Sequence, residues 1–254
     1  MCRARWSAPS PSRFRGSRAL ITVGFDTATA DTAVCSVRDG DVLFESLLGL
    51  SEKGGPRHTT ALLAEVERAA GAAGGWESVD RIAVGIGPGS FTGLRVGIAT
   101  ARALCLSRGL PLSGVGTLDA LGRGLGEIAG ERRCLAILDA RRGEVAAAVY
   151  SAAGELLWGP WLGTPEELAT RIPALPEPAL CGGPGAVRFR QQLTSRAVEI
   201  PDDADPVHRV AARHICALAA AVHGEDESGS VAPIYLRPPD AERWRERDHP
   251  REKG

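Results

Sequence analysis

The stretch Val79–Arg95, VDRIAVGIGPGSFTGLR, is the most informative part of the chain, because an apolar strand passes through a glycine loop directly into a helix. In this arrangement the N–H groups at the start of the helix can bind an anion. The residues that would carry out chemistry on a phosphate are missing nearby. The stretch therefore predicts an enzyme-like fold that lacks a catalytic set.

The loop does not match either of two common nucleotide motifs. A Walker A motif needs a lysine and a hydroxyl residue after its last glycine, but Leu94 and Arg95 follow Gly93. A dinucleotide fingerprint needs a third glycine, and Thr92 occupies that position. We favour the alternative that the loop forms a turn and that Ser90 caps the following helix, although phosphate binding remains open at this point.

The helix from Thr92 to about Ser107 is apolar nearly all round, so several of its sides must be covered. A partner chain could supply part of that cover. The preceding helix, about Arg57 to Ala73, offers a second candidate surface, although core packing is the commoner use of such a stripe. Its apolar residues recur at helical spacing: Leu62, Leu63, Val66, Ala69, Ala70 and Ala73.

Length and composition are those of an ordinary soluble globular protein of one large or two modest domains. The 254 residues are 44% hydrophobic and 24% charged, and a net charge of −1 gives no field that attracts nucleic acid or membrane. No apolar run approaches the ~20 residues that span a bilayer. Six cysteines without a C-x-x-C pair favour a reducing environment. We therefore expect a cytoplasmic protein.

The order of predicted elements indicates two halves of similar design. Each half opens with a meander of strands and then continues as alternating helices and strands. Strands are expected at 19–25, 33–37, 42–48, 79–86, 112–115, 134–138, 145–150, 155–161, 179–181 and 198–200. Helices are expected from about residues 57, 92, 117 and 164, and at 207–222.

This pattern predicts a duplicated α/β fold of the actin-like ATPase type, with two subdomains around a cleft. We place the first subdomain at 19–116, with a helix at 206–224 packing back on it, and the second at 117–205. Residues 1–18 lack the apolar segment of a secretory signal and are expected to be a disordered extension. Residues 238–254 are expected to be a charged tail.

Five motifs, in order from about Ile21 to Arg237, closely resemble the bacterial TsaB (YeaZ) family. They are Phe25–Thr29, Arg57-His58, Gly87–Gly97, Asp139–Val145 and Pro233–Arg237. The resemblance implies an actin/hexokinase/Hsp70-type fold and a role in making threonylcarbamoyladenosine in tRNAs that read ANN codons. It also implies that the chain is a noncatalytic partner of its paralogue TsaD, joined by the ATPase TsaE. ATP and metal are then expected on those partner subunits, and tRNA is expected to contact this chain only through the complex.

The residues of this chain agree with a noncatalytic role beside a catalytic partner. TsaD-like enzymes carry a metal-binding His-x-x-x-His at the start of the helix corresponding to Thr117 onward, where two histidines four apart share a helix face. Here Thr117 and Leu121 stand at those positions, and leucine cannot bind a metal. We therefore predict no metal site and no catalytic residues in this chain.

Two groups of residues are candidates for function. The first is a partner interface on the two apolar helices, which could serve a TsaD-like subunit or a homodimer: His58, Leu62, Val66, Phe91, Leu94, Arg95, Ile98 and Arg102. The second is a vestigial nucleotide cleft, formed by Asp26, Thr27, Thr29 and Asp139. At Asp139 an equally good interpretation is an aspartate that holds the Arg141–Gly143 turn.

Two other functions are considered. An ATP-dependent enzyme acting on its own would use Asp26 and Asp139 around phosphate and Mg²⁺. A glycoprotease-like metallopeptidase is disfavoured, because the chain has no H-E-x-x-H motif and no paired histidines.

Overall fold

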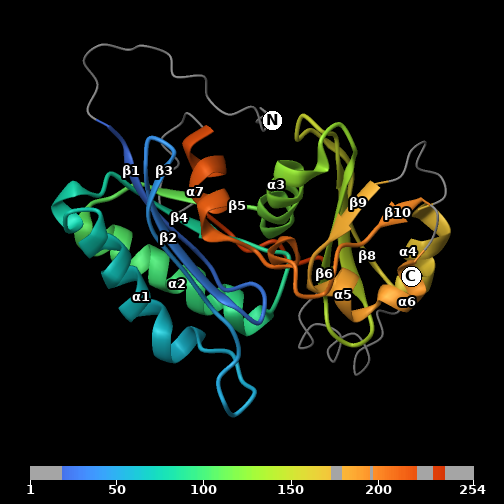
Figure 1. The fold of residues 1–254 in the computed structure, drawn as a ribbon. Coiled ribbons are helices and arrows are strands. Elements are labelled where there is room, and N and C mark those ends of the chain that lie inside the picture. The colour runs from blue at the N-terminus through green and yellow to red at the C-terminus, as the bar shows by residue number, and fades with distance from the viewer. Residues whose placement is uncertain (1–18, 173–178, 195–196, 222–230, 238–254) are drawn as a thin grey trace, which may run out of the picture.

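The computed structural model describes residues 19–172, 179–194, 197–221 and 231–237. The expected extension at 1–18 and the expected tail at 238–254 lie outside these residues. In the described part of the chain, two five-stranded mixed sheets lie next to each other, with helices between them and on their outer sides (Figure 1).

The first sheet has the strand order β3-β2-β1-β4-β5. The strands β1 (Ile21–Asp26), β2 (Thr32–Arg38) and β3 (Asp41–Leu48) form an antiparallel meander, while β4 (Arg81–Gly85) and β5 (Leu112–Val115) run parallel to β1. The predicted turn between β2 and β3 is present, since Asp39 and Gly40 both have positive φ angles, of 48° and 96°.

The second sheet repeats this topology in the order β8-β7-β6-β9-β10. Its meander consists of β6 (Cys134–Asp139), β7 (Val145–Tyr150) and β8 (Leu156–Gly163), and β9 (Ala179–Gly182) and β10 (Val198–Glu199) are parallel additions. The duplicated actin-like architecture predicted from the sequence is therefore confirmed.

Helices cover both sheets. They are α1 (His58–Ala72), α2 (Phe91–Arg108), α3 (Thr117–Ala129), α4 (Pro165–Arg171), α5 (Pro184–Arg188), α6 (Arg190–Leu193) and α7 (Ala212–Ala221), with 3₁₀ turns η1 (Trp76–Ser78) and η3 (Pro206–His208). The chain at 206–211, predicted as helix, is a 3₁₀ turn and a short extended link because Pro206 starts a new turn there. The sequence analysis missed α5 and α6, which are one turn each and too short to show helical periodicity.

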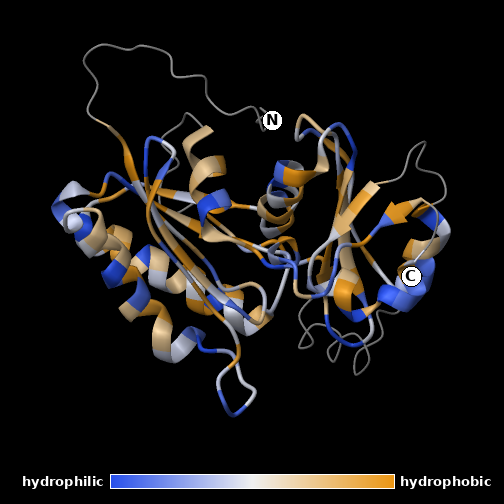
Figure 2. Ribbon diagram, in the orientation of Figure 1, coloured by the Kyte–Doolittle hydropathy of each residue, from blue (hydrophilic) through white to orange (hydrophobic). Residues whose placement is uncertain are grey.

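The alternation of side chains along the central strands decides which helix lies on which face. On β1, Val23 and Phe25 pack in the core formed with α1 and α2, whereas Gly24 faces Cys216 of α7. On β6, Ile137 packs in the core beside α4 and α5, and Ala136 and Leu138 pack in the core that contains α3. Hydrophobic residues follow the strands of both sheets, and polar residues gather in the loop between β3 and α1 (Figure 2).

The helices α3 and α7 join the two sheets. They contact each other, and their apolar residues share one core with β4 and β5 on one side and β6, β7 and β9 on the other. The boundary between the proposed subdomains, at residues 116 and 117, falls directly before α3. The proposed halves therefore meet across a packed layer of helices.

Candidate functional site

The glycine loop before α2 works as a helix start. Ser90 is the N-cap residue, and its Oγ accepts a hydrogen bond from the Gly93 N–H at 3.3 Å. The Ser90 N–H in turn donates to the Ala28 carbonyl at 2.7 Å. The hydroxyl and the N–H of Ser90 are therefore both bonded within the chain, as the capping interpretation predicted.

The glycines of this stretch allow α2 to press against the turn between β1 and β2. A Cβ atom at Gly89 would overlap the Ala28 carbonyl, and one at Gly93 would overlap the Thr27 carbonyl. The Thr27 hydroxyl also donates to the Gly93 carbonyl at 2.7 Å. Thr27 and Ala28 are buried against α2, so the part of the β1–β2 turn that faces the glycine loop is covered, while Thr29, Ala30 and Asp31 are partly exposed.

Asp26, the first residue predicted for a nucleotide cleft, is also enclosed. Its Oδ1 accepts from the Ala28 N–H and its Oδ2 from the Thr117 hydroxyl, both at 2.7 Å. Burial raises the pKa of this carboxyl group, while those two hydrogen bonds oppose the rise. Thr29, at the other end of the turn, accepts from the Asp31 N–H at 3.2 Å. This geometry makes Asp26 a partner of Thr117 rather than a ligand for solvent-borne metal.

The positions where TsaD-like enzymes carry histidines belong to the core. Thr117 accepts from the Gly87 N–H at 3.2 Å while it donates to Asp26, and Leu121 is fully buried. One turn into the same helix, Asp119 accepts from the buried Tyr150 hydroxyl at 2.7 Å, and burial raises the pKa of both groups. Within the described residues no group of three His, Cys, Asp or Glu side chains is placed to hold a metal ion.

Asp139, the second predicted cleft acid, holds the turn after β6. Its Oδ1 accepts from the Arg141 N–H at 2.9 Å, and its Oδ2 pairs with Arg188 at 2.7 Å. Arg141 and Arg142 both have positive φ angles, of 64° and 55°, which is uncommon for residues with a side chain. This geometry favours the turn-holding interpretation of Asp139, and the carboxylate is already paired with an arginine.

His58 packs within the chain at the start of α1. Its Nε2 lies 3.1 Å from the Thr29 carbonyl and therefore carries the proton, so Nδ1 accepts from the Thr32 hydroxyl at 2.9 Å. Burial lowers the pKa of the ring, which keeps it neutral. The side chain is 6% exposed, so it connects α1 to the β1–β2 turn and offers little surface to a partner.

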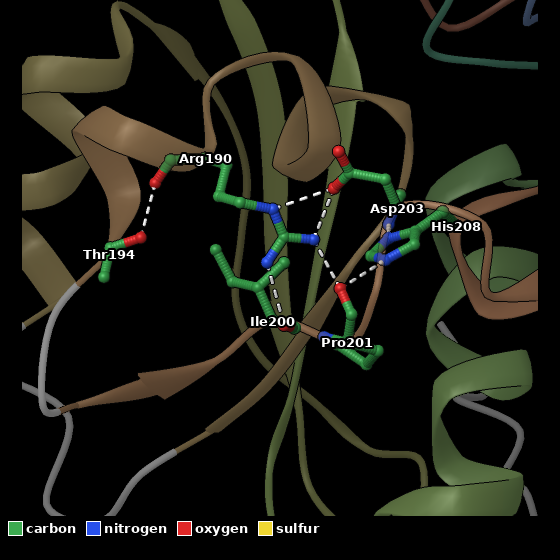
Figure 3. A network of polar contacts seen from close by, with 7 residues as sticks. Arg190, Thr194, Ile200, Pro201, Asp203 and His208 are labelled. Atoms are coloured by element: carbon green, nitrogen blue, oxygen red, sulfur yellow. Dashed lines mark hydrogen bonds and ion pairs between the residues drawn. The ribbon is translucent and has the colours of Figure 1, made fainter.

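His208 has a similar structural role in the second sheet (Figure 3). Its Nδ1 accepts from the Gly183 N–H at 3.2 Å, and its Nε2 donates to the Pro201 carbonyl at 3.1 Å. Arg190 donates to that same carbonyl and to Asp203. The network connects the loop after β10 to the glycine turn after β9. The Gly183 N–H of that turn is therefore bonded to a side chain of the same protein.

Four of the predicted interface residues are core residues, which corrects the sequence-based assignment of their side chains. Leu62, Val66, Leu94 and Ile98 are at most 5% exposed, and all but Leu94 belong to the core cluster beneath α1 and α2. Their spacing places them on the stripe of each helix that faces the sheet. A partner could reach them only by opening the fold.

The other predicted interface residues remain at the surface. Phe91 is 40% exposed, and the exposed Arg95 guanidinium stacks on its ring at 3.7 Å. Arg102 is also exposed, but it donates to the Val231 carbonyl at 2.6 Å. These three residues of α2 are therefore at the surface, although each also makes a contact within the chain.

Two exposed leucines were not among the predicted interface residues, and one of them, Leu63, was wrongly placed on the same face as the buried residues of its helix. Leu63 on α1 is 56% exposed and Leu106 on α2 is 86% exposed. The two helices contact each other and lie side by side on the outer side of the first sheet (Figure 1). Both leucines lie off the buried stripe of their helix, and helical spacing alone did not separate them from it, since each is one residue from a buried neighbour.

A cavity of about 580 Å³ opens between the start of α2 and the β6–β7 turn. Its lining combines the loop before α2 with four arginines and an aromatic pair: Pro88, Gly89, Ser90, Phe91, Thr92, Arg95, Ala140, Arg141, Arg142, Ala146, Leu162, Ile234, Tyr235, Leu236 and Arg237. Asp26 and Thr27 lie outside this lining.

No helix among the described residues is long and apolar enough to cross a membrane.

Comparison with known proteins places this arrangement in a family. Residues 51–197 match the family model described as "TsaD: tRNA N6-adenosine threonylcarbamoyltransferase". An uncharacterized protein of Mycobacterium tuberculosis is 35% identical over 215 residues, covering 83% of this chain and 91% of that protein. The tRNA threonylcarbamoyladenosine biosynthesis protein TsaB of Escherichia coli is 36% identical over 137 residues, 54% of this chain and 57% of that protein.

Solved structures agree with the sequence matches. YeaZ from Pseudomonas aeruginosa superposes with a TM-score of 0.69 at 25% identity, covering 85% of this chain and all of that one. A second structure, described as an uncharacterized protein with similarity to peptidase YEAZ from Pseudomonas aeruginosa, gives a TM-score of 0.72 at 26% identity, over 86% of this chain.

Proposed function

Since the chain belongs to the TsaB (YeaZ) family within the wider TsaD family, we propose that it is the noncatalytic partner of a TsaD-like subunit. The complex would make N6-threonylcarbamoyladenosine in tRNA, with a TsaE-like ATPase as a third component. ATP, metal and most tRNA contacts then belong to the partner subunits, and the protein acts in the cytoplasm.

The observation that carries the proposal is the exposed apolar outer side of α1 and α2. We call this the helical face and define it by Leu63, Phe91 and Leu106, with exposed fractions of 56%, 40% and 86%. The three side chains lie on two helices that contact each other, and a contiguous apolar patch across two such helices is the kind of surface that binds a partner. Interface centres are also rich in aromatic residues and arginine, and Arg95 stacks on Phe91 in this face.

The closed β1–β2 turn supports the noncatalytic part of the proposal. Phosphate chemistry in an actin-like fold would need the acid of this turn to face a ligand. Here Asp26 is 1% exposed and bonded to Thr117, while Thr27 is bonded to α2. An ATP-dependent enzyme acting alone would have to separate α2 from this turn first.

The test is coexpression with the TsaD homologue of the same genome, followed by affinity purification and assay of the modified nucleoside. Leu63→Glu and Leu106→Glu should each reduce both the copurified partner and the nucleoside, because a buried charge without a partner is costly. Leu157→Glu is the matched control, since Leu157 is 47% exposed but lies on β8 of the second sheet.

Equal recovery of the partner with all three variants, each still folded, would contradict the helical face as the binding surface. Pairing of two copies of this chain through the same face would show in the purified protein alone, as a dimer mass that Leu106→Glu abolishes. That outcome would assign the face to self-association instead.

A further inference from the structure

The segment Val231–Arg237 makes contacts with both halves of the molecule. Val231 is 5% exposed and packs in the core of the first sheet, while Leu236 packs against the core that includes strands of the second. We infer that this segment is a strap, a built-in connection that restricts how the β6–β7 turn moves relative to α2. The inference does not depend on the proposed partner.

The first end of the strap is fixed to the first half by hydrogen bonds to the backbone of the strap. Arg102 of α2 donates to the Val231 carbonyl at 2.6 Å, and the Ile234 N–H donates to the Ile86 carbonyl at 2.7 Å. A Cβ atom at Gly87 would lie 3.0 Å from the Ile234 carbonyl, so the strap also fits closely over the glycine loop. These contacts hold Val231 and Ile234 to α2 and to the end of β4.

The second end reaches the other half. The Tyr235 ring lies 5.4 Å from that of Phe91, between centroids, and is still part of the first-half contacts. Beyond it, Leu236 packs against the core that both sheets share through α3 and α7, and Arg237 forms an ion pair with Glu144 at the β6–β7 turn of the second half. Seven consecutive residues thus connect α2 to the turn that holds Asp139 and Arg141.

The strap also forms one wall of the 580 Å³ cavity, through Ile234, Tyr235, Leu236 and Arg237. The opposite walls come from α2 and the β6–β7 turn, the two parts that the strap connects. Because α3 and α7 already join the sheets through a shared core, release of the strap should loosen the halves and widen this cavity without separating them. Closure of one domain on another turns about a few loop or element-terminal residues, so a contact that bridges two halves outside their shared core limits that motion.

The test measures a distance between spin labels on the two halves of the full-length chain. Labels are attached at Gly71→Cys on α1 and Leu157→Cys on β8, both exposed positions, in a protein in which Cys2 is replaced by serine. The five cysteines among the described residues are buried, so they should not take up label. The parent should give one narrow distance distribution.

Release of the second end, with Leu236→Ala and Arg237→Ala together, should broaden that distribution and add a longer-distance population. Release of the first end, with Arg102→Ala, should do the same through different contacts, so the inference stays testable if one variant folds poorly. Hydrogen exchange at the Ile234 amide should rise about tenfold or more in both variants. Arg132→Ala is the control, since it removes an exposed ion pair with Glu199 inside the second half.

Two results would overturn the inference. The first is an unchanged distance distribution in folded variants whose Ile234 amide exchanges faster, because the strap would then detach without any effect on the halves. The second is equal broadening in the Arg132→Ala control, because the motion would then not depend on the strap.

Discussion

The close contact between α2 and the β1–β2 turn can be tested with alanine at Gly97. A Cβ atom there would overlap the Thr27 hydroxyl oxygen, whereas Thr27 Cβ and Val84 Cγ2 would each lie at 3.7 Å. The obstacle is therefore a single side-chain atom. Removing that atom with Thr27→Ala should make room for the added methyl group.

The expected change in the free energy of unfolding is the difference between two opposing contributions. Alanine in place of glycine within a helix stabilises by about 1 kcal/mol, whereas overpacking a buried site costs about 1–3 kcal/mol. Gly97→Ala should thus destabilise the parent by up to about 2 kcal/mol. Thr27→Ala should cost about 0.5–1.5 kcal/mol, because the buried hydrogen bond from the Thr27 hydroxyl to the Gly93 carbonyl is lost. In the Thr27→Ala background, Gly97→Ala should become neutral or stabilising, and the coupling should equal the overpacking cost of about 1–3 kcal/mol.

The assay is urea unfolding of the four proteins of this double-mutant cycle, with m-values checked for a constant unfolded state. Gly71→Ala on α1 is the control for helix propensity, since nothing lies within 4 Å of its added Cβ. Gly93→Ala is the contrasting variant, because its obstacle is the backbone carbonyl of Thr27, which Thr27→Ala leaves in place. Equal destabilisation by Gly97→Ala in both backgrounds would refute the packing argument.

Two further predictions concern stability. Burial beside Arg213 and Arg123 lowers the pKa of His214 to about 3, so the unfolded chain gains a proton below about pH 6.5 that the folded chain does not. The stability contributed by neutral His214 is complete above that pH and declines toward pH 3. Between pH 7.5 and 5 the free energy of unfolding of the parent should fall by about 2 kcal/mol more than that of His214→Leu, which is about 4–8 °C in Tm. Identical pH profiles of the two proteins in thermal denaturation would exclude this. Ser90→Ala should cost about 1 kcal/mol by loss of the α2 cap, Ser90→Asp should restore most of it, and equal urea midpoints for the two variants would argue against the cap.

Most of the fold could be predicted from local sequence signals. The Val79–Arg95 stretch indicated a strand, a turn and a capped helix, and β4, the Ser90 cap and α2 are present. Turn residues such as Asp39 and Gly40 marked the hairpin because their positive φ angles favour those residue types. The one-turn helices α5 and α6 could not be predicted, since they form around the Arg190 and His208 contacts, which join residues far apart in sequence.

The site was harder to predict because exposure depends on how helices pack. Periodicity identified α1 and α2 as apolar, but it could not show that Leu62 and Leu94 face the sheet while Leu63 and Leu106 face outward. Asp26 matched the acid of a nucleotide cleft by position, yet its carboxylate is enclosed by Thr117, a residue 91 positions away. Residue type and order were readable from the sequence, whereas the direction of each side chain required the packed structure.

The central claim is that the helical face binds a TsaD-like subunit. Calorimetric titration of the purified TsaD homologue into the parent chain and into Leu106→Glu tests it most directly. Full burial of one leucine contributes about 1.5–3 kcal/mol, and the account predicts that Leu106→Glu weakens the dissociation constant by at least about tenfold, which is about 1.4 kcal/mol, without lowering the thermal stability of the chain. An unchanged dissociation constant for a folded Leu106→Glu protein would contradict it.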